Sequence, residues 1–251
     1  MKIRLDELLV SRGLADSRTV AQRLVMEGKV RVKDYPSPKS GNKYDADIEI
    51  EVVGNDKFVS RGGEKLEGAF NSFGFSVEGL LCLDVGASTG GFTDCLLQHG
   101  AAKVASVDVG HDQFHPRLRA DPRVTVIEKF NARNMTPADL PFVPAFAVCD
   151  VSFISLRLIL PPMMAVLAPG GGIVTLIKPQ FEAGREQVGK GGVVRDEAVR
   201  AQVVESIRCF GVGIGLDWVG VSTSPITGPK GNVEYTAYWK KPLPVVESEI
   251  K

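Results

Sequence analysis

The stretch from Leu80 to Phe92 constrains the fold more than any other part of this sequence. An apolar run over residues 80–85 carries Asp84 near its end, and a turn rich in small residues follows it. Such a run, feeding a glycine-rich turn and then a helix, is typical of a buried strand and its loop in a doubly wound α/β sheet. Further apolar runs predict a Rossmann-like sheet with strands near 103–108, 124–127, 145–150 and 172–177, then a helix near 196–210 and strands near 216–222 and 233–239.

Two features of this region indicate its ligand. Asp108 ends the second apolar run, 24 residues after Asp84, close to the spacing of roughly 20 residues at which an acid binds a nucleotide ribose. Gly86 to Gly90 reads G-x-x-x-G, whereas a loop that binds pyrophosphate reads G-x-G-x-x-G. A loop that needs ribose contact without pyrophosphate fits S-adenosylmethionine. We expect cofactor contacts from Asp84, Gly86, Ala87, Ser88, Thr89, Gly90, Asp108, Val109, Asn131, Ala132, Arg133 and Asp150.

Other interpretations of the same residues remain open at this point. A glycine-rich turn after a strand is equally typical of a tight connection that binds nothing. Asp84 could cap the following helix, or it could hold the amino group of the cofactor, since an acid at the end of an apolar strand needs a partner.

The first 60 residues are organised differently. Leu5, Leu8 and Leu9 share one helical face, and Gly13 suits the end of that helix. Asp16 or Ser17 can cap a second helix that ends at Gly28. Alternating residues then predict short strands near 29–33 and 47–53. We therefore expect a small α+β domain with a short linker over residues 1–59, and the α/β domain over residues 60–251.

Charge is segregated within the N-terminal domain, although the 30 basic and 30 acidic residues of the whole chain balance. Residues 1–33 hold eight basic and four acidic residues, and residues 45–56 hold five acids and no base. A local basic excess is typical of a phosphate-binding face, and an ordinary solvated face is about as consistent with it. The candidate RNA contacts are Arg4, Arg18, Arg23, Lys29, Arg31 and Lys33.

Four charged residues are expected to meet at one edge of the predicted sheet. Asp150 and Lys178 each follow an apolar strand, Glu234 lies beside the start of the last strand, and Lys65 precedes the first strand on a predicted helix. A charge beside a buried strand is costly unless it reaches water, a partner or a ligand. Each residue alone fits a solvated position. As an ordered Lys–Asp–Lys–Glu set, they resemble the tetrad of FtsJ-type ribose 2′-O-methyltransferases.

The resemblance extends over nearly the whole chain. The N-terminal residues resemble the αL RNA-binding motif of a ribosomal small-subunit protein and of pseudouridine synthases. The whole chain is similar to the TlyA (hemolysin A-like) family, through residues 60–66, 84–93, 150–156, 176–182 and 231–235. This resemblance implies an enzyme that methylates ribosomal RNA with S-adenosylmethionine. Some members have a tryptophan in the linker, whereas residues 56–59 here read Asp-Lys-Phe-Val.

The chemistry of such a transfer assigns further roles. A ribose hydroxyl needs a proton acceptor as it reacts, and Lys178 is our candidate. Lys178 could instead orient the hydroxyl while Asp150 or water takes the proton. Phe153, three residues after Asp150, could stack on an extruded base or lie in the core.

Several classes of protein are disfavoured by the sequence. His111 and His115 lack partners with metal-ligand spacing, so we expect no metal. The four cysteines form no CxxC pair, which favours a reduced, cytoplasmic location. The N-terminus turns charged early, and Gly and Pro interrupt the most apolar region, so we expect no membrane contact. The alternative functions are a membrane-active cytolysin and a non-catalytic RNA-binding factor associated with ribosomes.

Overall fold

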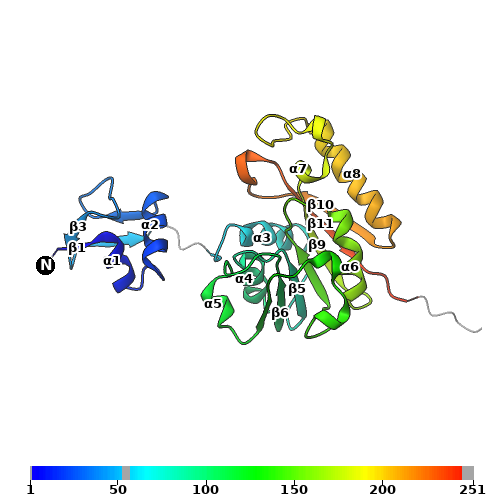
Figure 1. Ribbon diagram of the computed structural model, residues 1–251, viewed down its shortest axis with the longest axis horizontal. Helices are drawn as coiled ribbons and strands as arrows, with labels where there is room; N and C mark the ends of the chain where they lie inside the picture. Colours follow the sequence, from blue (N-terminus) through cyan, green and yellow to red (C-terminus); the bar gives the residue numbers. More distant parts are fainter. Residues whose placement is uncertain (1, 53–56, 245–251) are drawn as a thin grey trace, which may run out of the picture. The chain divides into compact units, whose positions relative to one another are not determined.

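A computed structural model describes residues 2–52 and 57–244 of the chain (Figure 1). The chain divides into two compact units, residues 1–57 and 58–251. The expected linker over residues 56–59 begins with Asp56, which lies outside the described residues. Phe58 is buried in the second unit, where its ring fills the position that a side chain at Gly63 would occupy.

The N-terminal unit is a small α+β domain. Two antiparallel ladders, β1 with β3 and β2 with β4, lie beside two helices. Of the two expected caps of the second helix, Ser17 is the one that accepts from the backbone N–H of Val20. Gly13 and Gly28 follow the two helices with φ of +68° and +70°, a backbone conformation that favours glycine. The elements are β1 (Lys2–Arg4), α1 (Leu5–Ser11), α2 (Arg18–Met26), β2 (Val30–Val32), β3 (Lys43–Asp45) and β4 (Ile50–Val52).

A buried acid joins the two helices of this unit. Asp6 is fully buried and accepts hydrogen bonds of 2.9–3.0 Å from Arg4, Arg18 and Gln22. These bonds, that from Arg4 above all, hold the pKa of Asp6 well below its usual range. Leu5, Leu8 and Leu9 lie in the core of the unit, as their helical spacing predicts.

The described residues of the C-terminal unit form a seven-stranded sheet with the order β10-β11-β9-β8-β5-β6-β7. The strands from β9 to β7 are parallel, and β11 runs antiparallel to both of its neighbours. The strands are β5 (Leu81–Val85), β6 (Lys103–Val107), β7 (Val124–Ile127), β8 (Phe146–Cys149), β9 (Gly172–Ile177), β10 (Asp217–Thr223) and β11 (Tyr235–Lys240). The doubly wound α/β fold expected from the sequence is confirmed, and each strand lies within a few residues of its predicted range.

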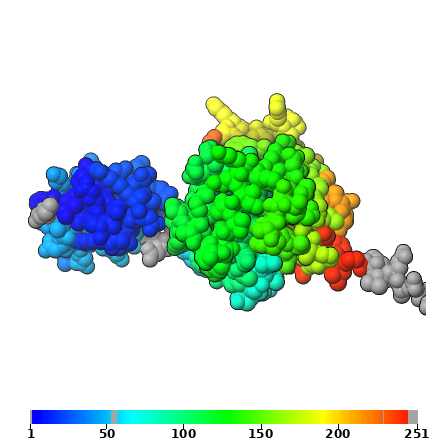
Figure 2. Space-filling view, turned by 60° about the horizontal axis from the view of Figure 1, so that its bottom comes forward, coloured from blue at the N-terminus to red at the C-terminus, as the bar shows by residue number. Residues whose placement is uncertain are grey.

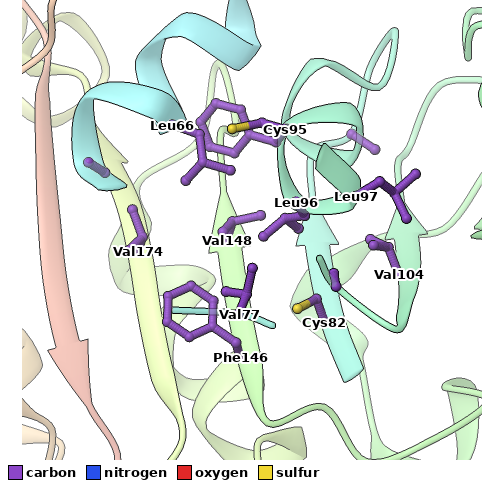
Figure 3. Packing of buried hydrophobic residues seen from close by; sticks show 14 of the residues in the cluster. Leu66, Val77, Cys82, Cys95, Leu96, Leu97, Val104, Phe146, Val148 and Val174 are labelled. Carbon is purple, nitrogen blue, oxygen red and sulfur yellow. The ribbon is translucent and has the colours of Figure 1, made fainter. Parts of the chain in front are cut away.

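Helices cover both faces of this sheet, because successive side chains of a buried strand point to opposite sides. Cys82 and Phe146 pack with α3 and α4 on one face (Figure 3), and Leu83 and Ala147 pack with α6 and α8 on the other. The helices are α3 (Gly62–Phe73), α4 (Gly91–Gln98), α5 (Pro116–Arg119), α6 (Leu160–Val166), α7 (Pro179–Glu182) and α8 (Glu197–Gly213), with 3-10 turns η1 (Ala132–Asn134), η2 (Pro137–Asp139), η3 (Leu156–Leu158), η4 (Arg185–Gln187) and η5 (Pro229–Gly231).

The strand order places several loops at one edge of the sheet. The chain leaves β5 toward β6 on one side and later returns to β8 on the other side, so β5 and β8 flank a switch point, where ligands bind in such sheets. Tyr235 pairs with Ile177, so the start of the antiparallel β11 lies at the carboxyl end of β9. The middle of the chain, coloured green, forms much of one face of this unit (Figure 2). Within residues 2–52 and 57–244, no helix has the length and apolar character needed to cross a bilayer.

Candidate active site

The glycine-rich loop after β5 is packed tightly against the loop after β8. Gly86 has a φ of +82°, and a Cβ there would lie 2.7 Å from the backbone oxygen of Asp150. Gly90, at the start of α4, has a φ of +95°, and its Cβ would lie 2.5 Å from Leu118. Glycine is therefore required at both positions, by conformation and by close approach.

Asp108, directly after β6, is bound to this loop. One carboxylate oxygen accepts the backbone N–H of Ser88 at 2.8 Å, and the other accepts the N–H of Gly110 at 2.6 Å. Gln113 donates to the second oxygen at 3.2 Å. Each carboxylate oxygen has more than one lone pair, so Asp108 keeps acceptor capacity for a further donor.

Asp84 lies beneath the same loop and is fully buried. Its Oδ2 accepts from Thr93 Oγ1 at 2.6 Å in the first turn of α4, and Thr93 also approaches Ser106 at 2.7 Å. Burial raises the pKa of Asp84 to about 7, against the effect of the Thr93 hydrogen bond. Its Oδ1 has no partner among the described residues. Contact with α4 therefore accounts for one oxygen of Asp84 and leaves the other unexplained.

The four charged residues expected to meet do converge. Lys65 Nζ donates to Glu234 Oε2 at 2.6 Å and lies 3.9 Å from Asp150 Oδ2. Lys178 Nζ lies 2.5 Å from Asp150 Oδ1. All four side chains are mostly buried, so the alternation of two ammonium and two carboxylate groups compensates charge that burial alone would make costly.

The fold explains this convergence. Asp150 and Lys178 follow the parallel neighbours β8 and β9, Glu234 precedes the antiparallel β11, and Lys65 lies in the first turns of α3. Elements between residues 62 and 240 therefore contribute to a single cluster at one sheet edge.

Two further polar residues belong to this cluster and were missed from the sequence. Ser152 Oγ accepts from Lys178 Nζ at 2.9 Å, and Gln180 Nε2 donates to Glu234 Oε1 at 3.1 Å. Each lies two residues beyond a tetrad member, Asp150 or Lys178. That adjacency was the only sequence feature that could have indicated them.

Phe153 is not a core residue, which decides one alternative left open by the sequence. Its side chain is 91% exposed, and its φ of +63° is left-handed, a conformation that is strained for a bulky residue. The ring lies 4.9 Å from that of Phe181, measured between centroids. Two aromatic rings therefore stand side by side at the edge that carries the tetrad.

Two adjoining cavities meet at Asp150. We call the first the Lys178 cavity: it has a volume of about 590 Å³ and is lined by the tetrad with Ala87, Thr89, Gly91 and Gln180, among others. The second, the Asp108 cavity, has a volume of about 380 Å³ and is lined by Val109, Gln113, Phe130, Asn131, Ala132 and Ile154, among others. Gly86, Ser88, Asp150, Ser152 and Phe153 line both.

Of the three residues expected at the end of the third strand, Asn131 and Ala132 line the Asp108 cavity. Arg133 is exposed, and its Nε lies 3.3 Å from Asn131 Oδ1. Its contribution to cofactor binding stays a prediction.

Comparison with known families decides what kind of protein this architecture belongs to. Residues 58–241 match the FtsJ-like methyltransferase family, and residues 3–32 match the S4 domain. The chain belongs to the FtsJ-like methyltransferase family. The site just described is therefore the candidate active site of an FtsJ-like methyltransferase that carries an N-terminal S4 domain.

Relatives of this FtsJ-like methyltransferase align with it over most of both chains. The chain is 45% identical to the 16S/23S rRNA (cytidine-2'-O)-methyltransferase TlyA of Mycobacterium tuberculosis, over 93% of this chain and 88% of that protein. It is 47% identical to Hemolysin A of Brachyspira hyodysenteriae, over 94% of this chain and 99% of that protein. A solved structure of a candidate hemolysin from Streptococcus thermophilus superposes with a TM-score of 0.76 at 45% identity, covering 96% and 89% of the two chains. The expected similarity to the TlyA (hemolysin A-like) family is confirmed.

The expected RNA contacts of the S4 domain are all partnered by acids. Arg4 and Arg18 bind Asp6, Arg23 and Lys29 lie beside Glu27, and the β2–β4 ladder brings Arg31 to Glu51 and Lys33 to Glu49. Most of these side chains are about half exposed or more. The pairs between exposed side chains are weak because solvent screens them, whereas Arg4 and Arg18 bind the fully buried Asp6. Contact of these six residues with RNA stays a prediction.

The FtsJ-like domain also brings together possible metal donors that sequence spacing did not predict. Glu67, Cys95 and His99 lie between α3 and α4, with donor atoms within 4.8 Å of one another, and His99 Nε2 is 2.8 Å from Glu67 Oε2. His115 instead caps α5, where its Nδ1 accepts from Arg117. The expectation that the protein uses no metal stays a prediction.

Proposed function

We propose that this chain transfers a methyl group from S-adenosylmethionine to the 2′-hydroxyl of a ribose in ribosomal RNA, in the cytoplasm. The observation that carries the proposal is the convergence of Lys65, Asp150, Lys178 and Glu234 on the Lys178 cavity, which adjoins the Asp108 cavity. The name of the M. tuberculosis relative supports both the RNA substrate and the ribose oxygen as acceptor.

The Asp108 cavity has the chemistry that the nucleoside part of S-adenosylmethionine requires. Asp108 can accept from ribose hydroxyls, and Phe130, Ile154 and Val109 offer apolar surface to an adenine ring. The loop at Gly86 allows close backbone approach where the cavities join. Asp84, with one buried oxygen unpartnered, lies under this loop and is suited to the cofactor's ammonium group.

S-adenosylmethionine supplies an electrophilic methyl group on a positively charged sulfur. The new oxygen–carbon bond would form as the bond between the methyl carbon and sulfur breaks, with the sulfur leaving as a neutral thioether, and the ribose hydroxyl must lose its proton. Asp150 lies where the cavities meet, and Lys178 Nζ lies 2.5 Å from its Oδ1 in the Lys178 cavity, so the two can hold that hydroxyl and receive its proton. Whether the proton goes to Lys178, to Asp150 or to water distinguishes a general base from an orienting group.

Lys65, Glu234 and Ser152 fix the reacting pair. The Lys65–Glu234 bond keeps a second ammonium group 3.9 Å from Asp150, and Ser152 accepts a hydrogen bond from Lys178. Alignment of oxygen, methyl carbon and sulfur is worth a large share of the rate in such a displacement, because the reactants no longer need to find this geometry. Rigid placement of these groups is therefore the main contribution of the protein.

The target nucleotide has candidate contacts outside the tetrad. The exposed ring of Phe153 can stack on a base that has left its helix, and the cations of the S4 domain can bind phosphates elsewhere on the same RNA. Phe153 borders both cavities, so a base stacked on it lies beside the ribose oxygen to be methylated.

Methyl transfer to purified ribosomal subunits tests the proposal. The protein is incubated with radiolabelled S-adenosylmethionine and 30S or 50S subunits, and the labelled RNA is digested to nucleosides for mass spectrometry. We expect 2′-O-methylated nucleoside from the wild-type protein and none from Lys178→Ala. A methyl group on a base would contradict ribose as the acceptor, and binding of RNA without any transfer would identify a non-catalytic factor.

A further inference from the structure

The segments that follow β8 and β9 are joined at three successive places. Lys178 contacts Asp150 and Ser152, and Phe181 packs against Phe153. Glu182 binds the side chain of Ser155 and the backbone of Leu156. Residues 150–156 and 178–182 therefore pair in order, and the residues of the first two contacts line the Lys178 cavity. The first two contacts belong to the site already described, whereas the third is not part of it.

Glu182 makes this third contact with both carboxylate oxygens. Its Oε2 accepts from Ser155 Oγ at 2.6 Å, and its Oε1 accepts the backbone N–H of Leu156 at 2.7 Å. Ser155 in turn caps η3 by accepting from the N–H of Arg157 at 3.2 Å. One side chain at the end of α7 thus fixes the far end of the loop that begins at Asp150.

The geometry points to Glu182 as a positioning residue for methyl transfer: its carboxylate holds the loop of residues 151–155 so that Ser152 and Phe153 face the reacting groups. The inference rests on the proposed function for its catalytic consequence, whereas the placement of the loop can be measured without it. Within the described residues, Glu182 has no hydrogen bond to the tetrad and does not line the Lys178 cavity. It therefore acts through the loop of residues 151–155.

The strained backbone of Phe153 explains why such a restraint is needed. A left-handed φ costs a non-glycine residue on the order of 1 kcal/mol or more, so a loop released at one end will relax toward negative φ. The contact between the Phe153 and Phe181 rings is the smaller restraint, since Phe153 is 91% exposed. Glu182 supplies two charge-assisted hydrogen bonds beside it, which are stronger than neutral ones.

The partly buried setting of Glu182 agrees with this role. Burial raises the pKa of its carboxyl, against the effect of the Ser155 and Leu156 hydrogen bonds. A surface acid would serve solubility at no desolvation cost. The two hydrogen bonds that Glu182 accepts, from Ser155 and Leu156, offset the cost of removing its carboxylate from water.

Four variants separate positioning from a general effect. Glu182→Ala removes both hydrogen bonds, and Ser155→Ala removes one of them together with the cap of η3. Glu182→Gln keeps an acceptor for Leu156 and can donate to Ser155 Oγ, so it should restore function. Glu186→Ala is the matched control, an exposed acid four residues further along the same segment.

The first measurement is hydrogen exchange of the amides in residues 150–158, without substrate. We expect Glu182→Ala to exchange faster than wild type there, including the Leu156 amide, while peptides from β5 and β6 keep their rates. The second is the single-turnover rate at saturating S-adenosylmethionine and RNA, at least 10 °C below each melting temperature and normalised to the fraction of protein that binds the cofactor. Glu182→Ala should be between about 10-fold and 100-fold slower, because small misplacements of reacting groups have effects of this size.

The conservative variants complete the test. Glu182→Gln should lie within about threefold of wild type, and Ser155→Ala should lie between Gln and Ala. Unchanged exchange in residues 150–158, a wild-type rate in Glu182→Ala, or an equal loss in Glu186→Ala would each overturn the inference. If Glu182→Ala does not fold, Ser155→Ala becomes the deciding variant. A wild-type rate together with wild-type exchange in Ser155→Ala would then overturn the inference. A wild-type protein that transfers no methyl group would refute the proposed function, and the exchange data would still judge the placement of the loop.

Discussion

Lys65 and Glu234 are 169 residues apart in the sequence and are joined by a hydrogen bond of 2.6 Å between Nζ and Oε2. Both side chains are nearly inaccessible to solvent, and the bond ties the start of α3 to the segment before β11. Asp150 adds a second carboxylate 3.9 Å from the same ammonium group. The pair therefore has a structural task as well as its proposed place in the tetrad.

Loss of one partner should destabilise the fold. Glu234→Gln leaves the Lys65 ammonium with less compensation in a buried position, and we expect the free energy of unfolding to fall by about 3 kcal/mol. The double variant with Lys65→Met should regain part of that loss, because the uncompensated charge is gone. Urea unfolding of the single and double variants measures the coupling. Strictly additive effects would mean that the two side chains do not depend on each other.

Substitution of Lys178 should affect the chemical step more than binding. Lys178→Ala should abolish methyl transfer in single turnover while the affinities for S-adenosylmethionine and RNA stay within a few fold, since its ammonium acts on the hydroxyl as the transition state forms. Lys178→Arg distinguishes the two roles left open. A guanidinium does not release its proton near neutral pH, so an active Arg variant would exclude a general base. Near-wild-type transfer by the Ala variant would remove Lys178 from the mechanism.

Asp108 should control the affinity for the cofactor. Asp108→Asn loses charge and one acceptor position beside Ser88 and Gly110, so we expect calorimetry to give a dissociation constant at least about tenfold weaker. Asp112→Asn is the control, because Asp112 is exposed nearby and Asn tolerates its φ of +58°. Equal affinities of the two variants would disprove ribose binding by Asp108.

The buried carboxyl of Asp84 should make stability depend on pH. Burial raises its pKa to about 7, whereas an unfolded chain ionises near 3.9. Between these values the folded state holds a proton that the unfolded state has lost, so the free energy of unfolding should fall by about 1.4 kcal/mol per pH unit. This contribution is complete below about pH 4 and is lost by about pH 7.

Asp84→Asn should remove that slope, because an amide stays neutral. Urea unfolding of both proteins between pH 4 and pH 8 gives the difference directly. If the difference in free energy of unfolding between wild type and Asp84→Asn does not change with pH, the Asp84 carboxyl ionises in the folded protein as it does in the unfolded chain.

Neutralising the cations of the S4 domain should flatten the salt dependence of RNA binding. Each of Arg23, Lys29 and Arg31 that contacts a phosphate should contribute a little under one unit to the slope of log K against log salt. Replacement by Gln, singly and together, should therefore weaken binding and lower the slope stepwise. Arg208→Gln on α8, which breaks an ion pair with Glu205, is the matched control. An unchanged slope in the triple variant would place the phosphate contacts elsewhere.

The strands of the C-terminal unit were predictable because they are buried on both faces and appear as apolar runs. β5 and β9 agree with the expected ranges within one or two residues. The antiparallel direction of β11 was not predictable, since it depends on its pairing with β9 and leaves no local mark in the sequence. The same applies to β1 and β3, each three residues long and stabilised by the other.

The candidate site was predictable where a charge directly follows or precedes a strand. Asp150 and Lys178 were found in this way, and the fold brings them to 2.5 Å. Ser152 and Gln180 were missed because uncharged polar residues in loops are common and carry no cost that calls for an explanation. The exposure of Phe153 also depends on its backbone conformation, which the sequence does not reveal.

The insertion of β11 between β9 and β10 has a consequence for the nascent chain. Every described element of the S4 unit has been synthesised by residue 52, so this unit can fold while most of the chain has not yet been made. The C-terminal sheet, in contrast, has a gap beside β9 until residues 235–240 leave the ribosome, and Lys65 has no Glu234 until then. If the proposed function holds, the order of synthesis completes the RNA-binding unit first and the catalytic tetrad last, and an interrupted chain would then bind RNA without modifying it.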